Sequence, residues 1–479
     1  MKLFRFFLLI SFILFNFSVS AFTQKTKTET AAFIDQHKAQ YVKVAKTIWE
    51  HPELGYLEFK SSALLQKMLK EEGFTIQKGV AGIPTAFIAS YGSESPVIGI
   101  LGEFDALPGL SQEAIPEKKP VIEDGPGHGC GHHLFGTASA AAAISVKHWL
   151  IATGTKGTIR FYGCPAEEGG SGKVYMVRAG LFNDVDIVLH WHPADMNSAD
   201  PWTSLANISA KFRFTGIASH AAAAPEKGRS ALDGVESMDY MVNMMREHVP
   251  QETRIHYVIT NGGGTAPNVV PAKAEVFYYV RFTNAKDLMD IFNRVVKAGQ
   301  GAALGTGTTM NYEIIHGVHT LLPNVSLSKL MDANLRRVGG VSYTEDEEQF
   351  AEKIRTTLIG ARTPMEAAKE VTPFQLVHTS ASSDVGDVSW NVPTAGVVTA
   401  CWIPGTPPHS WQAVACGGTG IAMKGMINAA KIMSFTAIDL FADHNKIKEA
   451  RTEFLERRGP DFKYTPLLGD RKPPLNYRK

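Results

Sequence analysis

The stretch that most constrains the fold of this chain is residues 125–138, Gly-Pro-Gly-His-Gly-Cys-Gly-His-His-Leu-Phe-Gly-Thr-Ala. It sets a cysteine and three histidines among glycines and then runs into a small-residue helix predicted over 137–153. Glycines let a backbone bring side chains together without steric cost, and thiolate and imidazole ligands suit a zinc-like metal. The stretch therefore predicts a metal site at a strand-to-helix junction. A glycine-rich turn around a buried free thiol is the alternative.

Cys130 and His132 carry this prediction because they are two residues apart. In an extended segment, side chains i and i+2 point the same way. We therefore expect a thiolate and an imidazole to face one spot, whereas the next residue, His133, would face away from it.

The first part of the chain alternates strands with helices. The predicted strands are 85–90, 97–102, 157–163 and 186–193. The predicted helices are 31–49, 61–72 and 137–153. This alternation predicts an α/β fold with a mixed, largely parallel sheet.

A second pattern begins at residue 204, where the order becomes β-α-β-β-α-β. Its strands are predicted at 208–216, 254–260, 274–282 and 308–315, and its helices at 229–248 and 285–303. This order is typical of a small ferredoxin-like α+β domain. A strand at 395–400 and a helix at 420–441 follow it, so the small domain is expected to be inserted in the larger one. The polar residues 340–380 are expected to form an irregular surface insertion.

These patterns divide the chain into five parts. They are a signal peptide at 1–21, the first part of the larger domain at 22–203, the small domain at 204–316, the second part of the larger domain at 317–445 and a C-terminal extension at 446–479.

The N-terminus has the layout of a secretory signal peptide. Lys2 and Arg5 precede a nearly unbroken apolar run at 6–17, and Val19-Ser20-Ala21 offers a cleavage site after Ala21. A short membrane anchor is the alternative, although the apolar run is short for a bilayer span. We therefore expect a periplasmic or secreted protein with no stable membrane insertion after cleavage.

Composition excludes one class of partner. The 479 residues carry a formal net charge of +1 and no long basic run. An electrostatic nucleic-acid partner needs a concentrated basic face, so none is expected. The four cysteines form no small-domain disulfide framework.

Further candidate ligands follow the predicted strands. Glu167 and Glu168 come after the strand at 157–163, and His190 and His192 end the strand at 186–193. The carboxyl ends of parallel strands are where ligands bind in open α/β sheets. One of two adjacent carboxylates can bind metal while the other takes a proton from water. A solvated acidic pair is the alternative for the two glutamates.

Three more residues are less specific when taken alone. His409 lies in a Pro-rich loop before the last long helix, where a single histidine is most often exposed. Asp105 and Asp384 are each either an outer-shell carboxylate to a ligating histidine or a plain turn residue.

Together the motifs resemble the aminoacylase and carboxypeptidase G superfamily of metal-dependent amidohydrolases. Within it they are similar to the branch of indole-acetyl-amino-acid, hippurate and aminobenzoyl-glutamate hydrolases. Seven ordered motifs carry the resemblance, at residues 103–112, 127–132, 165–170, 216–221, 267–271, 383–390 and 405–412.

The resemblance implies a two-metal site, with zinc or manganese, in the larger domain. Matched motif by motif, the implied metal ligands are Cys130, His132, Glu168, His192 and His409. Glu167 is the implied general base, and the small domain is the implied lid and dimer interface.

Three residues of the small domain are implied to contact substrate. His220 is similar to a histidine that crosses to the partner's active site and stabilises the oxyanion. Asn268 and Arg281 match substrate-holding positions, and a guanidinium can bind a carboxylate in a bidentate way. The implied partners are a small amide substrate with a free carboxylate and a second copy of the chain, or a related second subunit.

Two features depart from the family pattern. Relatives usually have Asp or Asn where this chain has His133, so an outer-shell role or an altered metal preference is open. The sequence Leu-His-Trp-His-Pro at 189–193 offers two histidines, and the branch resemblance favours His192 over His190.

The resemblance implies cleavage of an N-acyl amino acid or an aminobenzoyl-glutamate-like conjugate by activated water. A metal-dependent dipeptidase or carboxypeptidase is one alternative, and a hydrolase with Cys130 as nucleophile is another. A non-catalytic exported binding protein on the same fold is a third, against which the retained Glu167 argues.

We expect the exported chain to begin at Phe22, because Val19 and Ala21 fit the cleavage site of a signal peptide. Mass spectrometry of the N-terminal peptide from the periplasmic or culture fraction measures this. Recovery of residues 1–21 on a membrane-bound chain would contradict the cleavage.

Overall fold

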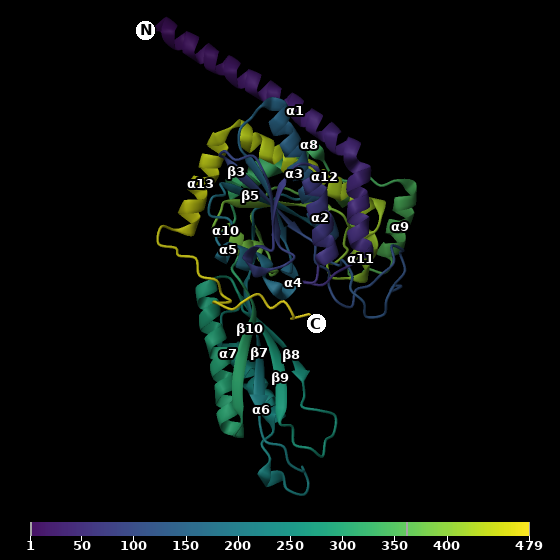
Figure 1. The fold of residues 1–479 in the computed structure, drawn as a ribbon, viewed down its shortest axis with the longest axis vertical. Helices are drawn as coiled ribbons and strands as arrows, with labels where there is room; N and C mark the ends of the chain where they lie inside the picture. The colour runs from purple at the N-terminus through teal and green to yellow at the C-terminus, as the bar shows by residue number, and fades with distance from the viewer. Residues whose placement is uncertain (1, 361–362, 479) are drawn as a thin grey trace.

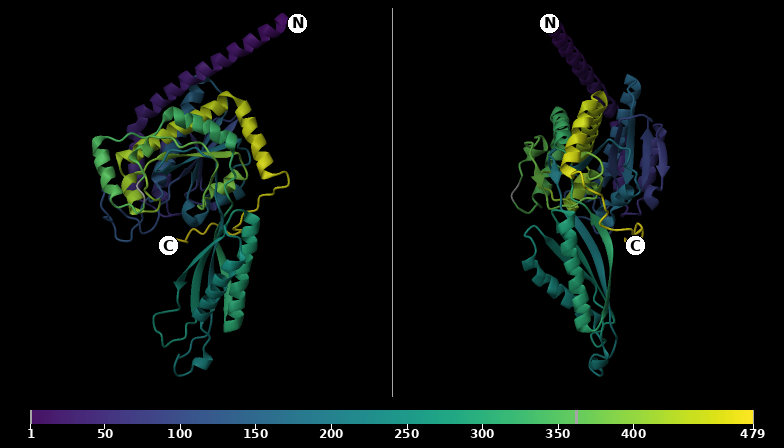
Figure 2. Two further views of the ribbon diagram at one scale, coloured as in Figure 1. Left: turned by 180° about the vertical axis from the view of Figure 1, so that it is seen from behind. Right: turned by 90° about the vertical axis from the view of Figure 1, so that its left-hand side faces the viewer.

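The computed structural model describes residues 2–360 and 363–478, with side chains from Lys25 onward in these ranges. The predicted signal peptide, residues 1–21, lies outside the described side chains. The protein consists of a larger body and a smaller, elongated body below it in Figure 1. Figure 2 shows the same two bodies from behind and from the side.

The larger body is built on a six-stranded sheet in the order β1-β2-β4-β3-β5-β12. Its strands are β1 (Thr75–Lys78), β2 (Phe87–Tyr91), β3 (Val97–Glu103), β4 (Thr158–Cys164), β5 (Ile187–Ala194) and β12 (Thr394–Ala400). β4, β3, β5 and β12 are parallel, whereas β1 and β2 pair antiparallel at one edge. The predicted mixed, largely parallel sheet is confirmed.

Helices cover both faces of this sheet. One face carries α1 (Lys2–Glu50), α2 (Phe59–Glu71), α3 (His132–Thr153), α8 (Val325–Val338) and α12 (Gly420–Ala442). The other face carries α5 (Gly172–Arg178) and α10 (Val385–Ser389). Within β3, Ile98 and Ile100 enter the first core and Val97 and Leu101 the second, as the two-residue period of a strand requires.

Shorter elements complete the larger body. They are β6 (Trp202–Thr203), β11 (Val377–His378), α4 (Glu167–Gly170), α9 (Glu345–Arg355), α11 (Trp411–Gly417) and α13 (His444–Arg458). Among the described side chains, α3 is the one helix long and apolar enough to cross a membrane, and most of it is buried in the core.

The smaller body is an antiparallel sheet with two helices. Its elements are β7 (Ala206–Thr215), α6 (Ala231–Met245), β8 (Arg254–Asn261), β9 (Lys273–Phe282), α7 (Ala285–Thr306) and β10 (Thr309–Val318). The order β10-β7-β9-β8 is the ferredoxin-like order. The chain returns to the larger body after Val318, so the small domain is an insertion.

Two sequence expectations are wrong in detail. α3 begins at His132, ahead of the predicted 137, because Gly131 adopts a left-handed conformation (φ 74°) at its N-cap. The expected irregular stretch 340–380 contains α9, which Thr344 and Glu347 begin with a reciprocal pair of capping hydrogen bonds.

Two glycines set how closely α3 approaches β3. A Cβ on Gly136 would lie 2.7 Å from the carbonyl oxygen of Glu103, and one on Gly102 would lie 3.4 Å from the Cα of Gly136. This backbone contact brings the first turn of α3, which carries His132, against the carboxyl end of β3.

We expect Gly136→Ala to destabilise the protein by about 1–3 kcal/mol, because the new methyl group overpacks a backbone contact. Gly305→Ala in α7 is the matched control, since a Cβ there meets nothing within 4 Å. It should stabilise the protein by about 0.5–1 kcal/mol. Urea denaturation measures both, and equal signs for the two variants would contradict the close packing of α3 on β3.

Candidate active site

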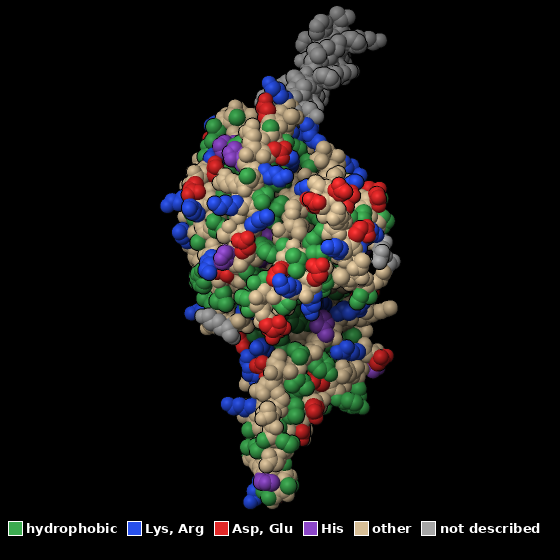
Figure 3. All heavy atoms as spheres, turned by 90° about the vertical axis from the view of Figure 1, so that its right-hand side faces the viewer, with side chains coloured by type: hydrophobic (Ala, Val, Ile, Leu, Met, Phe, Trp, Pro, Cys, Tyr) green, Lys and Arg blue, Asp and Glu red, His purple; other side chains and the backbone are tan. Residues whose placement is uncertain are grey.

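The candidate site lies at the carboxyl ends of β3, β4 and β5. Glu103 ends β3, Glu167 and Glu168 follow β4, and His192 lies near the end of β5. This edge faces the small domain, and Figure 3 shows the surface hollowed where the two bodies meet, with a histidine beside the hollow. The placement is the one expected for ligand binding in an open α/β sheet.

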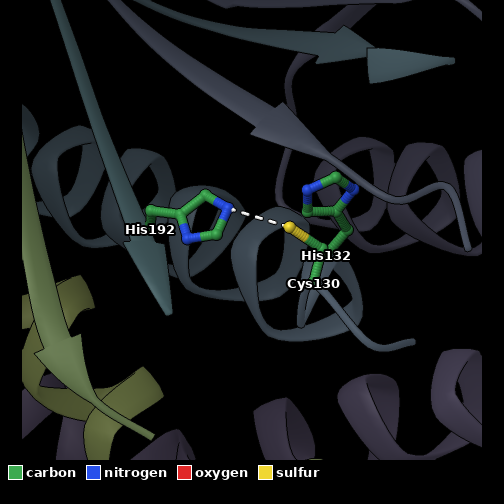
Figure 4. Close-up of side chains that lie close together, drawn as sticks. All are labelled: Cys130, His132 and His192. Atoms are coloured by element: carbon green, nitrogen blue, oxygen red, sulfur yellow. Dashed lines mark hydrogen bonds between the residues drawn. The ribbon is translucent and has the colours of Figure 1, made fainter. Parts of the chain in front are cut away.

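Cys130, His132 and His192 form the first of three donor groups, in which all ligand atoms lie within 4.8 Å of one another. The Sγ atom of Cys130 lies 3.4 Å from Nε2 of His192 (Figure 4). Cys130 and His132 converge through the turn at Gly131, so the extended segment expected from their spacing is wrong. His190 is in none of the three groups, and its ring lies against Gly396.

The other two groups contain the glutamates. Cys130, Glu168 and His409 form one, in which Nε2 of His409 lies 3.2 Å from Oε1 of Glu168. Glu103, His132 and Glu167 form the other. Glu168 therefore faces Cys130, while Glu167 faces the Glu103 side.

Asp105 orients two of these residues. Its Oδ1 lies 2.9 Å from Nδ1 of His132, and its Oδ2 accepts a hydrogen bond of 2.9 Å from the backbone N–H of Glu168. A carboxylate on Nδ1 leaves Nε2 of His132 for a metal. Of the two interpretations open for Asp105, the outer-shell carboxylate fits this geometry.

The donor atoms fit divalent metal ions. Nε2 of His132 and Oε1 of Glu168 are buried without a hydrogen bond of good geometry, although Oε2 of Glu103 lies 3.0 Å from the first and Nε2 of His409 lies 3.2 Å from the second. Buried polar atoms are normally satisfied, so these two point to a ligand. A thiolate with imidazoles and carboxylates is a donor set that suits zinc-like ions.

Burial and neighbouring charges shift the pKa values of the candidate site residues. Burial, Glu103 and Glu168 raise the pKa of Glu167 well above its ordinary value. Burial and Glu168 likewise raise the pKa of the Cys130 thiol well above its ordinary value. Burial acts to lower the pKa of His132, but Cys130, Glu103 and Asp105 outweigh it and raise that pKa. A metal would stabilise the thiolate that burial disfavours.

Lys173 belongs to the site, although its place there was not predicted from the sequence. This lysine is fully buried in α5, where its Nζ lies 2.6 Å from Oε1 of Glu103 and 2.7 Å from Oδ1 of Asp384. Asp384 therefore pairs with a lysine, and neither of its two expected roles is correct. Only Glu103, which ends β3 two residues before Asp105, offered a sequence signal, because a charged residue ending a buried strand needs a partner.

The predicted residues of the small domain separate into two places. Arg281 of β9 is half-buried beside the donor groups, and its charge acts on Glu167. His220 and Asn268 are exposed in the loops after β7 and before β9, where the backbone N–H of Ala221 bonds the carbonyl of Asn268. These loops lie at the opposite end of the small-domain strands from Arg281, so one chain does not bring His220 to the donor groups.

Sequence comparisons relate this chain to peptidases and amide hydrolases. Residues 206–306 match the M20 peptidase dimerisation domain. The chain is 44% identical over 446 residues to a p-aminobenzoyl-glutamate hydrolase subunit of Escherichia coli (strain K12), covering 88% of this chain and 93% of the relative. It is 28% identical over 452 residues to the Xaa-Arg dipeptidase of Mus musculus, covering 91% and 94%.

Among solved structures, the fold is similar to a dinuclear metal-binding peptidase of the M20 family from Bacillus subtilis. The TM-score is 0.57 at 17% identity, covering 85% of this chain and 99% of that chain. At this identity the likeness concerns the fold.

His133 is turned into the core. Its Nε2 lies 3.0 Å from the carbonyl oxygen of Gly417, its ring packs 4.9 Å from that of His128, and it is in none of the donor groups. Burial lowers the pKa of His133 to about 3. The ring is therefore neutral in the folded protein at neutral pH.

Because the pKa of an unfolded histidine is about 6.5, the unfolded chain binds a proton below this pH that folded His133 does not. Stability from the neutral ring is present above pH 6.5 and is lost as the pH falls toward 3. Between pH 7 and pH 5, the free energy of unfolding of the parent protein should therefore fall by up to about 2 kcal/mol more than that of His133→Asn, which lacks the buried ring.

Urea denaturation at the two pH values measures this difference, and His51→Asn at an exposed position controls for loss of a histidine as such. An equal fall in parent and His133→Asn proteins would contradict the buried neutral ring.

Proposed function

Because this chain belongs to the M20 peptidase family and is a hydrolase of amide or peptide bonds, we propose that it is a two-metal amidohydrolase. Its substrate in this proposal is an N-acyl amino acid or an aminobenzoyl-glutamate-like conjugate. The observation that carries the proposal is the position of Glu167, a partly buried carboxyl group with a raised pKa that lies in one donor group with Glu103 and His132.

Cys130, His132, Glu168, His192 and His409 are the proposed ligands of two divalent ions, zinc or manganese. When bound, such ions lower the pKa of water and polarise an amide carbonyl. Asp105 holds His132 and the Glu168 backbone in place for this role. Nε2 of His132 and Oε1 of Glu168, which lack a hydrogen bond of good geometry, support the assignment.

Glu167 is the proposed general base. It takes the proton of the attacking water and passes it to the leaving nitrogen, so that the amide C–N bond breaks to give a carboxylic acid and an amine. Its raised pKa makes this carboxylate a stronger base than an exposed glutamate, as acceptance of a proton from water requires.

Arg281 is the proposed site for the free carboxylate of the substrate. Its Nη1 donates 3.3 Å to Oγ of Ser382, while its Nε is buried without a partner. The guanidinium therefore has donors to spare for a carboxylate, which it can bind in a bidentate way.

The small domain supports a proposal about assembly. In a homodimer, or with a related second subunit, the exposed His220 and Asn268 of one chain would enter the partner's site, where His220 stabilises the oxyanion. The match to a dimerisation domain supports this arrangement, and so does the Escherichia coli relative, which is itself named as one subunit of a hydrolase. We also propose that the chain is exported and cleaved after Ala21.

A dipeptidase or carboxypeptidase is the second candidate function. The likeness to Xaa-Arg dipeptidase favours it, and the same donor groups and Glu167 would act on a peptide bond. The substrate separates the two functions.

A Cys130 nucleophile is the third candidate. Its Sγ is 3.4 Å from Nε2 of His192, as in a thiol–imidazole pair. Reactive cysteines, however, have lowered pKa values and electropositive surroundings, whereas burial and Glu168 raise the pKa of this thiol. The metal-ligand role fits these surroundings better.

We expect Glu167→Gln to lower kcat by about 10²–10⁴-fold with metal content unchanged, because it removes proton transfer and keeps the size of the side chain. Hydrolysis is measured with zinc and with manganese on aminobenzoyl-glutamate, hippurate, indole-acetyl conjugates and dipeptides. Glu113→Gln, at a glutamate outside the donor groups, is the control.

Removal of the metals should abolish hydrolysis, and zinc or manganese should restore it. Activity that survives complete metal removal would instead favour the Cys130 nucleophile. Unchanged hydrolysis by Glu167→Gln of every substrate would show that the proposed base is wrong.

A further inference from the structure

The turn that carries Glu167 and Glu168 has an unusual backbone. Ala166 has φ 56° and Gly169 has φ 88°, both in the left-handed region. Glycine adopts this region freely, but a residue with a side chain, such as Ala166, keeps it only where the surroundings hold it. Contacts to the polar backbone groups of residues 166–170 are therefore expected to hold this turn and the two glutamates that it carries.

Buried side chains hold three of these groups. The N–H of Ala166 donates 2.8 Å to Oε1 of Glu58, and the N–H of Glu168 donates to Asp105. The hydroxyl of Tyr56 donates 2.6 Å to the carbonyl of Gly170. The carbonyl of Glu168 lies between these groups.

Two residues from the far end of the sequence hold that carbonyl. The hydroxyl of Tyr477 donates 3.0 Å to the oxygen of Glu168, and Nη2 of Arg478 donates 2.8 Å to the same oxygen. In Figure 1 the yellow segment after α13 runs to the junction of the two bodies and ends near α4. A segment predicted as a C-terminal extension thus reaches the candidate site.

Tyr477 and Arg478 are tightly enclosed there. A Cβ on Gly55 would lie 2.4 Å from the hydroxyl oxygen of Tyr477. The ring of Tyr477 meets the ring of Tyr56 edge-on, with 5.6 Å between the ring centroids. A Cβ on Gly169 would lie 3.4 Å from the hydroxyl of Tyr279 and 3.8 Å from Nη2 of Arg478. Arg478 and Tyr279 of strand β9 therefore both lie beside the glutamate turn, and β9 also carries Arg281.

The segment is anchored to both bodies before it reaches the site. Tyr464 donates 2.7 Å to Oδ1 of Asp387 in α10, and Arg178 of α5 donates 2.7 Å to the carbonyl of Gly469. Arg471 pairs with Glu313 of β10 at 2.9 Å. Residues 459–478 thus have a fixed path along the larger body and the base of the small domain.

We propose that Tyr477 and Arg478 are positioning residues of the active site. They fix the carbonyl of Glu168 and thereby the turn in which Glu168 faces Cys130 and His409 while Glu167 faces the opposite side. The inference rests on the proposed function for its catalytic consequence. Its structural content, that these two residues hold a metal-donor carboxylate in place, is independent of the substrate.

The test uses Arg478→Gln, Arg478→Lys and Tyr477→Phe in the full chain. Arg478→Gln should lower kcat by about 10–100-fold, the equivalent of one hydrogen bond to a charged group, with KM changed less than about 3-fold. Tyr477→Phe, which keeps its ring, should lower kcat by about 3–10-fold. Arg478→Lys should recover part of the loss because an ammonium can also donate to the carbonyl.

A second readout does not need turnover. Competition with a chelator measures zinc affinity, which should fall by about 10-fold in Arg478→Gln, as for other residues that orient metal ligands. Lys472→Gln removes the same charge from an exposed position of the same segment, and it should leave both readouts unchanged.

Two outcomes overturn the inference. A raised KM with kcat intact would make Arg478 a substrate contact, and unchanged kcat and zinc affinity would leave the two residues without a role in the site. If Arg478→Gln does not fold, Tyr477→Phe decides by the same two readouts. If the parent protein hydrolyses no substrate, the proposed function fails, and zinc affinity alone still decides for or against positioning.

Discussion

The constraint on which this structure depends is that the charges at the carboxyl edge of the sheet are buried and must be paired. Lys173 lies between Glu103 and Asp384, Glu103 also meets His132, and His132 meets Asp105. Removal of one partner from a buried pair costs about 3–5 kcal/mol. Since the members come from β3, α3, α5 and α10, these elements cannot shift independently. The donor atoms are consequently held in register by the folded protein itself.

Much of the fold was predictable because its signals are local. The alternation of strands and helices, and the change of order at residue 204, depend on side-chain periodicity that each segment carries by itself. The candidate ligands were readable for a related reason. Cys130, Glu168 and His192 stand directly at strand ends or at a strand-to-helix junction, and parallel strands bring such ends to one edge. His409 gained its meaning only from the family resemblance.

The rest depends on contacts that no local pattern reveals. Glu168 and Arg478 are 310 residues apart, and nothing around Arg478 marks it as close to a glutamate turn. The burial of Lys173 depends likewise on partners from two distant segments. At Gly131 the outcome was predicted correctly but for the wrong reason. Cys130 and His132 do converge, through a left-handed turn at Gly131 and not through an extended segment. The capping pair of Thr344 and Glu347, by contrast, is a local signal for α9. The polar composition of residues 340–380 led to the expectation of an irregular segment there.

The path of residues 459–478 has a consequence for a chain that is clipped near its end. All the candidate metal donors, up to His409, lie ahead of this segment and would remain in such a chain. The hold on the Glu168 carbonyl comes only with Tyr477 and Arg478. Loss of the last residues would therefore keep every donor side chain in the protein and loosen the turn that carries two of them. Proteolysis at the C-terminus would weaken the site without removing any part of its donor set.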